Sequence, residues 1–115
     1  MNNQKRCVVQ SDYSSAFPDP FKLTKGECLK TSDRKSEWEG WIWCTSESGQ
    51  RGWIPTNYLS IEKDSAVLQQ DYDATEMNVS IGDELTIVME EAGWAWCVKS
   101  NGEAGWVPLE NVKIA

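Results

Sequence analysis

The stretch WIWCTSESGQRGWIPTNYL at residues 41–59 recurs 53 residues later as WAWCVKSNGEAGWVPLENV at residues 94–112. No gap is needed inside either stretch, and each has Trp-x-Trp-Cys, a Gly-x-x-Gly and a Trp-Ile/Val-Pro at the same positions. Repetition on this scale decides the fold, because each copy is one structural unit. The chain of 115 residues is therefore predicted to contain two small related modules.

The repeat extends upstream in two further blocks. Residues 8–13 match residues 67–72 at a separation of 59, and residues 23–29 match residues 79–85 at a separation of 56. The first copy thus has three extra residues in each of two gaps. Insertions of this kind are tolerated in surface loops. The matched blocks are therefore predicted to be strands and the gaps to be loops.

Local patterns also favour strands. Aromatic and β-branched residues precede a short Gly-containing loop, which is typical of a β-hairpin. Pro55 and Pro108 follow at positions where a strand ladder should stop, since proline has no amide donor. Helical periodicity is not sustained over any long window; residues 81–92 come nearest, and their Gly-Asp and Ile-Val pairs favour a turn and a strand. Core positions are predicted at Phe21, Leu23, Leu29, Met77, Val79, Leu85 and Ile87.

The repeats set the predicted domain boundaries. We expect a first domain over residues 1–61, a linker over residues 62–65 and a second domain over residues 66–115. Domains of about 55 residues bury a modest core. A four-residue linker spans at most about 13 Å, so a restricted relative orientation is expected.

Charge is divided unevenly between the two halves. Residues 1–62 contain eight basic and eight acidic residues, whereas residues 63–115 contain three basic and ten acidic residues and account for the net charge of −7. Such a surface repels phosphate, so nucleic acid is not expected as a partner. It suits a basic peptide, although the same charge would also serve solubility alone.

The residue types exclude the common forms of catalysis. There is no histidine, so neither a Ser-His-Asp nor a Cys-His site can form. The four cysteines form no Cys-x-x-Cys pair, so no metal site is predicted, and Cys44 and Cys97 are interpreted as small core residues. We expect no enzyme activity and no cofactor. No stretch approaches membrane-spanning length and no apolar leader follows the N-terminus, so no membrane partner and a cytoplasmic location are expected.

Taken together, the blocks resemble the Src homology 3 (SH3) domain, twice and in a divergent form. That family has an Ala-Leu-Tyr-Asp-Tyr strand, a Lys-Gly-Asp-x-Leu turn, a Trp-containing strand, a Gly-x-x-Gly hairpin and a Pro-Ser-Asn-Tyr segment. Five pieces appear in order in each copy, from about residue 7 to residue 114. The resemblance implies an all-β chain of two consecutive five-stranded SH3-like barrels.

The resemblance also implies that the modules bind proline-rich or basic peptide segments. A polyproline II ligand is already extended, so it loses little entropy when it docks between aromatic rings. Carried over position by position, the implied peptide-binding residues are Tyr13, Trp41, Pro55, Asn57, Tyr58, Tyr72, Glu76, Trp94 and Pro108. In the first copy Pro20 stands where the family has a loop acid, so Asp19 beside it, and Glu37 and Glu39 in the next loop, are the acids expected to receive a basic ligand residue. We expect the first domain to be the main site, with Tyr13, Trp41, Pro55 and Tyr58 in one groove.

Both copies depart from the family pattern. Ser11 and Gln70 replace the first tyrosine of the strand, which forms one aromatic wall of the family's groove. In the first copy, Phe17 or Phe21 would have to supply that wall. Glu110-Asn111 stands where the family has Asn-Tyr. These losses support an alternative function, a structural or regulatory scaffold of two packed barrels with degenerate grooves. A cell-wall-binding role, known for bacterial SH3-like modules, is disfavoured by the lack of an export signal.

Overall fold

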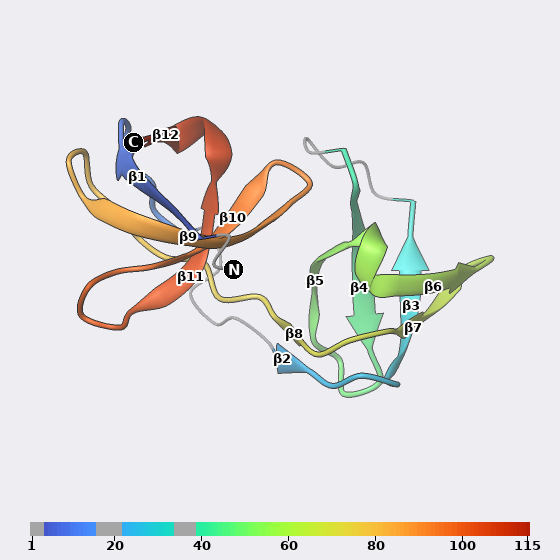
Figure 1. Cartoon of the computed structure of the whole chain (residues 1–115). Coiled ribbons are helices and arrows are strands. Elements are labelled where there is room, and N and C mark those ends of the chain that lie inside the picture. The colour runs from blue at the N-terminus through green and yellow to red at the C-terminus, as the bar shows by residue number, and fades with distance from the viewer. Residues whose placement is uncertain (1–3, 16–21, 34–38) are drawn as a thin grey trace. The chain divides into compact units, whose positions relative to one another are not determined.

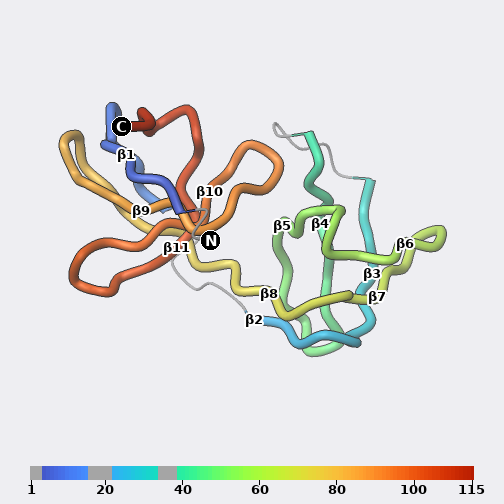
Figure 2. Tube along the Cα trace, in the orientation of Figure 1, coloured from blue at the N-terminus to red at the C-terminus, as the bar shows by residue number. Residues whose placement is uncertain are grey.

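The fold consists almost entirely of short β-strands. The computed structural model describes residues 4–15, 22–33 and 39–115. Figures 1 and 2 show the chain path, and two short 3₁₀ turns, Thr56–Tyr58 and Leu109–Asn111, precede the last strand of each repeat. The strands are β1 (Lys5–Val9), β2 (Lys22–Leu23), β3 (Cys28–Ser32), β4 (Trp41–Ser46), β5 (Arg51–Pro55), β6 (Leu59–Glu62), β7 (Ser65–Leu68), β8 (Tyr72–Asp73), β9 (Glu84–Glu91), β10 (Trp94–Val98), β11 (Ala104–Pro108) and β12 (Val112–Ile114).

Two five-stranded sheets form, and this confirms the predicted fold class. One sheet has the order β11-β10-β9-β1-β12 and the other has the order β5-β4-β3-β7-β6, while β2 and β8 form a separate pair. The predicted hairpins are present as β4–β5 and β10–β11. Gly49 and Gly102 turn these hairpins with φ angles of 91° each, a conformation that glycine adopts without strain.

The two sheets exchange their equivalent first strands. Strand β1 comes from the first repeat, yet it lies between β9 and β12 of the second, with Cys7 opposite both Leu85 and Ile114. Strand β7 comes from the second repeat, yet it lies between β3 and β6 of the first, with Ala66 opposite Leu29 and Ile61. Each acceptor sheet thus receives the strand of the other repeat in the equivalent register.

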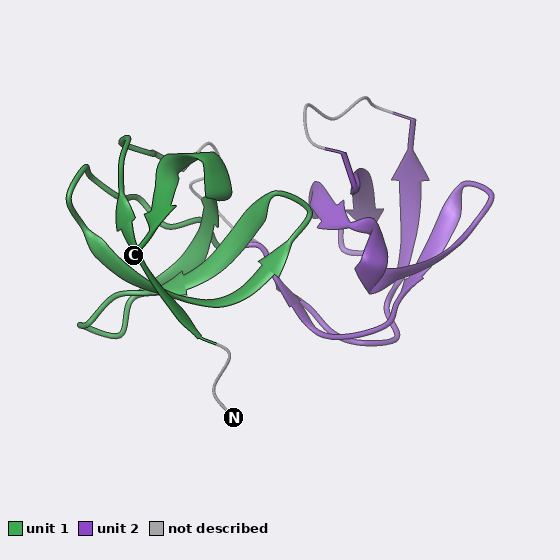
Figure 3. Cartoon of the chain, turned by 45° about the horizontal axis from the view of Figure 1, so that its top comes forward, with its two compact units in different colours: residues 1–19, 75–115 green, residues 20–74 purple. Residues whose placement is uncertain are grey.

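The compact units therefore differ from the predicted domains. Unit 1 comprises residues 1–19 and 75–115, and unit 2 comprises residues 20–74 (Figure 3). The boundaries predicted at residues 61–66 follow the sequence repeats and do not separate these units. The physical reason is that β1 and β7 have equivalent patterns, so the repeat alone does not specify which sheet each strand joins.

Alternation along the exchanged strands builds both cores. Cys7 and Val9 of β1 point inward in unit 1, while Ala66 and Leu68 of β7 do so in unit 2. The predicted core positions Leu23, Leu29, Met77, Val79, Leu85 and Ile87 are all buried, as are Cys44 and Cys97. Phe21 lies outside the described residues.

Two classes of feature are absent from the part of the chain that the structure describes. It contains no helix long and apolar enough to cross a membrane. Within the same residues, no group of three or more cysteine, aspartate or glutamate side chains is placed to hold a metal ion.

The buried thiols predict a loss of stability at high pH. Burial raises the pKa of Cys44 from 9.0 to about 11 and that of Cys97 to about 12, and it also raises the pKa of Cys7. The unfolded chain releases these protons first, so the stabilisation is complete below about pH 9 and declines as the pH rises toward 11 and 12. We expect the free energy of unfolding to fall by about 2 kcal/mol for each of these two thiols, Cys44 and Cys97, between about pH 8.5 and pH 11.

Urea unfolding followed by tryptophan fluorescence at each pH measures this loss. A Cys44→Ala/Cys97→Ala chain is the control and should show a shallower decline. In the native protein near pH 8, the exposed Cys28 should react with a thiol reagent well before the three buried cysteines. A pH-independent free energy of unfolding over this range would contradict the assignment.

Candidate functional site

An aromatic pair joins the two repeats within unit 1. Tyr13 lies just after β1, where its backbone pairs with Val79 through two N–H···O bonds of 2.9 Å. Its ring meets Trp94, at the start of β10, edge to face with centroids 5.7 Å apart. Both rings are partly exposed, so they offer apolar surface to a ligand.

The hydroxyl of Tyr13 is committed to a carboxylate. It donates a hydrogen bond of 2.5 Å to Glu76 Oε1. Burial raises the pKa of Tyr13, and both the hydrogen bond and the charge of Glu76 raise it further, so the phenol remains a donor at neutral pH. The pair therefore presents a fixed ring beside an anionic group.

Glu76 is positioned by a close backbone approach. The segment that carries it runs parallel to β11, with Trp106 N donating to Thr75 O at 2.8 Å and Met77 N donating to Trp106 O at 3.0 Å. Gly105 permits this approach, since a Cβ there would lie 2.9 Å from both the Cβ and the backbone nitrogen of Met77. Gly105, the second glycine of the Gly-x-x-Gly motif, is therefore needed in this repeat because a larger residue would collide with Met77.

Gly105→Ala is expected to destabilise unit 1 by about 1–3 kcal/mol, because the added methyl group overpacks against backbone as well as side chain. Thermal unfolding followed by near-ultraviolet circular dichroism measures the effect. The Tyr13–Glu76 contact should loosen in the same variant. A stability equal to that of the parent would show that the Thr75–Met77 segment can move away without cost.

Asn111 occupies the position of the family's tyrosine and faces inward. Its side-chain nitrogen donates to Ser11 O at 3.3 Å and to Asp12 O at 3.1 Å, and its own carbonyl accepts from Gln10 N at 2.8 Å. From the sequence alone, Asn111 is only a position where the family's tyrosine is lost. Its role in holding the exchanged segment depends on the strand pairing, so no local signal reveals it.

Acidic residues accompany the unit 1 pair. Glu90, near the end of β9, binds Lys5 Nζ at 3.3 Å, and Glu110 is exposed beside Asn111. Pro108 lies opposite Trp94 in the β10–β11 ladder and is buried. Unit 1 therefore combines a partly exposed aromatic pair with surface carboxylates, and the Glu76 carboxylate is in direct contact with that pair.

The equivalent tyrosines in unit 2 are less accessible. Tyr58 and Tyr72 meet edge to face with centroids 5.4 Å apart, and each is only 4% exposed. The hydroxyl of Tyr72 donates to Trp53 O at 3.1 Å. Trp41 is partly exposed opposite the fully buried Pro55, and Asn57 is exposed.

The structure thus regroups the predicted peptide-binding residues. Tyr13, Glu76, Trp94 and Pro108 belong to unit 1, whereas Glu39, Trp41, Pro55, Asn57, Tyr58 and Tyr72 belong to unit 2. The predicted groove of Tyr13 with Trp41, Pro55 and Tyr58 is corrected: strand exchange gives Tyr13 to unit 1 and puts Tyr72 in its place. Asp19, Glu37, Phe17 and Phe21 lie outside the described residues.

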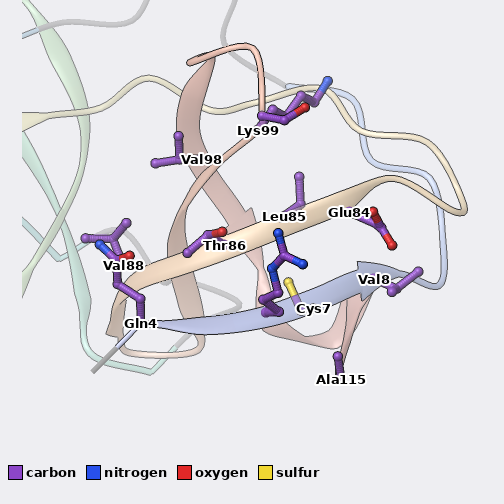
Figure 4. Close-up of a pocket in the computed structure, with 12 residues that line it drawn as sticks. Gln4, Cys7, Val8, Glu84, Leu85, Thr86, Val88, Val98, Lys99 and Ala115 are labelled. Atoms are coloured by element: carbon purple, nitrogen blue, oxygen red, sulfur yellow. The ribbon is translucent and has the colours of Figure 1, made fainter. Parts of the chain in front are cut away.

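A separate pocket of about 380 Å³ opens on the β1–β9–β10 region of unit 1 (Figure 4). Arg6 and Lys99 line it together with Glu84, Thr86 and Val98. None of Tyr13, Glu76 or Trp94 contributes to its wall. The opposite charges and the residues Gln4 and Ala115 at its edge give it no defined ligand chemistry, so the aromatic pair is the candidate site.

Comparison with known proteins agrees with the repeat. The sequence model of the variant SH3 domain matches residues 6–62 and again residues 68–115. A mouse protein, SH3 and PX domain-containing protein 2B, is 25% identical over an alignment of 123 residues that covers 92% of this chain. The aligned part is 13% of that protein's length. No solved structure matches the chain significantly.

Proposed function

We propose, since this chain belongs to the SH3 family and consists of two variant SH3 repeats, that it recognises a proline-rich segment carrying a basic residue. SH3 domains are protein-interaction modules, and the chain is accordingly a non-enzymatic interaction module. The proposal adds the ligand class and the place of binding, namely the surface of unit 1 around Tyr13 and Trp94. A cytoplasmic location belongs to the same proposal.

One observation carries the proposal. Tyr13 and Trp94 form a partly exposed aromatic pair with a carboxylate hydrogen-bonded to the tyrosine. A polyproline II helix presents ridges that fit between such rings, and docking costs it little conformational entropy. The family resemblance predicts the main site in the first repeat; we keep Tyr13 from that repeat and add Trp94 from the second.

The charges of unit 1 favour a basic ligand residue. Glu76 accepts a hydrogen bond from Tyr13 and Glu110 is exposed, whereas two of the four described cations of unit 1, Lys5 and Lys99, are engaged with carboxylates. Opposite charges across an interface increase association rate and specificity more than affinity. A lysine or arginine next to the proline ridges would therefore orient the peptide on unit 1.

A second candidate function suits unit 2. Tyr58 and Tyr72 are each only 4% exposed, and the Tyr72 hydroxyl already has a backbone partner. These features favour a scaffold role for that barrel, with its groove serving packing more than ligand binding.

Peptide titration with NMR detection distinguishes these possibilities. The probe is a dodecapeptide with two Pro-x-x-Pro repeats and a terminal arginine. Controls are a scrambled peptide of the same composition and the same peptide with glutamate in place of arginine. We expect saturable shifts at Tyr13 and at the Trp94 indole, and weaker shifts with both controls. Shifts confined to Trp41 and Tyr58, or none at all, would overturn the proposal.

A further inference from the structure

We propose that charge selects which strand each barrel accepts. The body of unit 1, residues 75–115, is a strand-binding site for an extended basic segment, and residues 4–9 are its occupant. This inference concerns strand pairing. Charge selection can fail without affecting the peptide-binding proposal, whereas loss of the exchange itself would remove both.

The seated strand makes a specific ion pair. Lys5 lies opposite Ile87 in the β1–β9 ladder, and its Nζ lies 3.3 Å from Glu90 Oε2. Arg6 lies opposite Thr86, and Glu84 lies opposite Val8. The two basic residues at the start of β1 therefore meet a strand, β9, that carries three carboxylates and no cation.

The alternative pairing, in which each repeat keeps its own first strand, would bring like charges together. Ser65 of β7 lies opposite Lys30 of β3, and Arg6 holds the equivalent position in β1. Arg6 would then lie opposite Lys30 of β3 on one side and opposite Glu62 of β6 on the other, so only its β3 neighbour would carry a like charge. Asp64, the counterpart of Lys5, would move to the position beside Glu90. Like charges opposite each other destabilise a sheet.

Net charges favour the observed exchange in the same direction. Residues 75–115 contain seven acidic and two basic residues, and residues 63–74 contain three acidic residues and one basic residue. In the exchanged arrangement, the acidic residues 63–74 do not pair with residues 75–115, which are also acidic. Residues 4–9, with two basic and no acidic residues, take its place.

A further ion pair in unit 2 also depends on the exchange. Lys22 of β2 lies opposite Asp73 of β8, with Nζ 3.8 Å from Oδ2. The residue of the first repeat equivalent to Asp73 is the neutral Ser14. Each such exposed pair shifts an equilibrium by no more than about fivefold, so several acting together are needed for selection.

Cys28 offers a reporter for the strand arrangement. It is exposed on β3, opposite Val67 of β7. Directly opposed residues in antiparallel strands have Cα separations that a disulfide can span. A Val67→Cys chain should therefore form an intramolecular bond to Cys28 in the exchanged arrangement. A Val8→Cys chain should form one only where the repeats have not exchanged, since Val8 otherwise faces Glu84 and Lys113.

The test refolds each full-length variant from urea and then oxidises it with oxidised glutathione. The intramolecular disulfide between Cys28 and the introduced thiol is counted by peptide mass spectrometry. With the parental charges, we expect this bond in most molecules of the Val67→Cys chain and in few molecules of the Val8→Cys chain. Lys5→Glu/Arg6→Glu in the Val8→Cys chain should raise its bonded fraction by about tenfold. Arg51→Glu, an exposed reversal on β5, should not.

Two further measurements keep the test decisive if the double reversal folds poorly. Adding Glu90→Lys to a Val8→Cys chain that carries Lys5→Glu should return its bonded fraction toward the parental value. Refolding the Val8→Cys chain in about 1 M salt should raise that fraction by screening the pairs. Equal bonded fractions in all charge variants of the Val8→Cys chain and at both salt concentrations would overturn charge selection. With parental charges, an intramolecular bond in most molecules of the Val8→Cys chain, or bonds only between molecules, would overturn the exchange itself.

Discussion

Leu68→Ala is expected to destabilise unit 2 by about 2–5 kcal/mol, the usual cost of a cavity at a buried leucine, although Leu68 belongs to the second sequence repeat. Its side chain is 1% exposed in the core of unit 2. Its amide donates to Glu27 O at 3.0 Å, and its carbonyl accepts from Gly26 N at 2.7 Å. All of these partners come from the first repeat, so the damage should appear there.

Hydrogen exchange resolved by residue measures where the damage falls. In Leu68→Ala, amides of Cys44 and Ile54 should exchange faster, while those of Cys97 and Val107 should change little. Val9→Ala is the matched control, because Val9 holds the equivalent position in unit 1 and should give the reverse pattern. If Leu68→Ala instead exposed the amides of Cys97 and Val107, each repeat would hold its own first strand.

Trp94→Ala is expected to weaken binding of the arginine-bearing proline-rich dodecapeptide by about 2–4 kcal/mol. Buried aromatic anchors at protein interfaces commonly contribute on this scale. The indole is partly exposed and already oriented by Tyr13 at 5.7 Å, so little entropy is lost when a ligand orders it. Isothermal titration calorimetry on the full chain measures the change.

The equivalent residue of the other barrel provides the control. Trp41→Ala should weaken the same peptide by less than about 1 kcal/mol, because Tyr58 and Tyr72 of the same unit are buried and offer a ligand little aromatic surface. Tyr13→Ala combined with Trp94→Ala should cost less than the sum of the single changes, because the two rings contact each other. A larger loss from Trp41→Ala than from Trp94→Ala would place the site in unit 2.

The sequence predicted the local structure of this chain well. The doubled Trp-x-Trp-Cys and Gly-x-x-Gly blocks became hairpins, and positions such as Leu85 and Cys97 are buried as their strand patterns predict. These features depend on alternation and turn residues within a few positions of each other. Hydrophobic period and turn chemistry therefore suffice to find them.

Strand partners were not predictable in the same way. Val8-Val9 of β1 and Val67-Leu68 of β7 have the same apolar pattern. Either strand could therefore pair with β3 or with β9. Register follows the apolar pattern, but it does not distinguish two equivalent acceptors. For this reason the family pattern predicts a groove of Tyr13 with Trp41, whereas the structure packs the Tyr13 ring against Trp94.

The candidate site could not be predicted in full for the same reason, because its residues come together only through the strand exchange. Residue types at Tyr13, Glu76 and Trp94 follow from the family pattern, whereas their assembly requires the exchange. Asn111 shows the same limit, because its bonds to Ser11 and Asp12 join residues about 100 positions apart in sequence. Charges at Lys5, Arg6 and Glu90 do contain information about the pairing, but only once both arrangements are compared.

Cross-strand nuclear Overhauser effects of Cys7 test the exchange most directly. In the full chain at low concentration, Cys7 should show backbone contacts to Leu85 and Ile114, its ladder partners in unit 1. Ala66 should show the matching contacts to Leu29 and Ile61. Contacts from Cys7 to Leu29 and Ile61 would show that each repeat folds on its own, and would contradict a site shared by Tyr13 and Trp94.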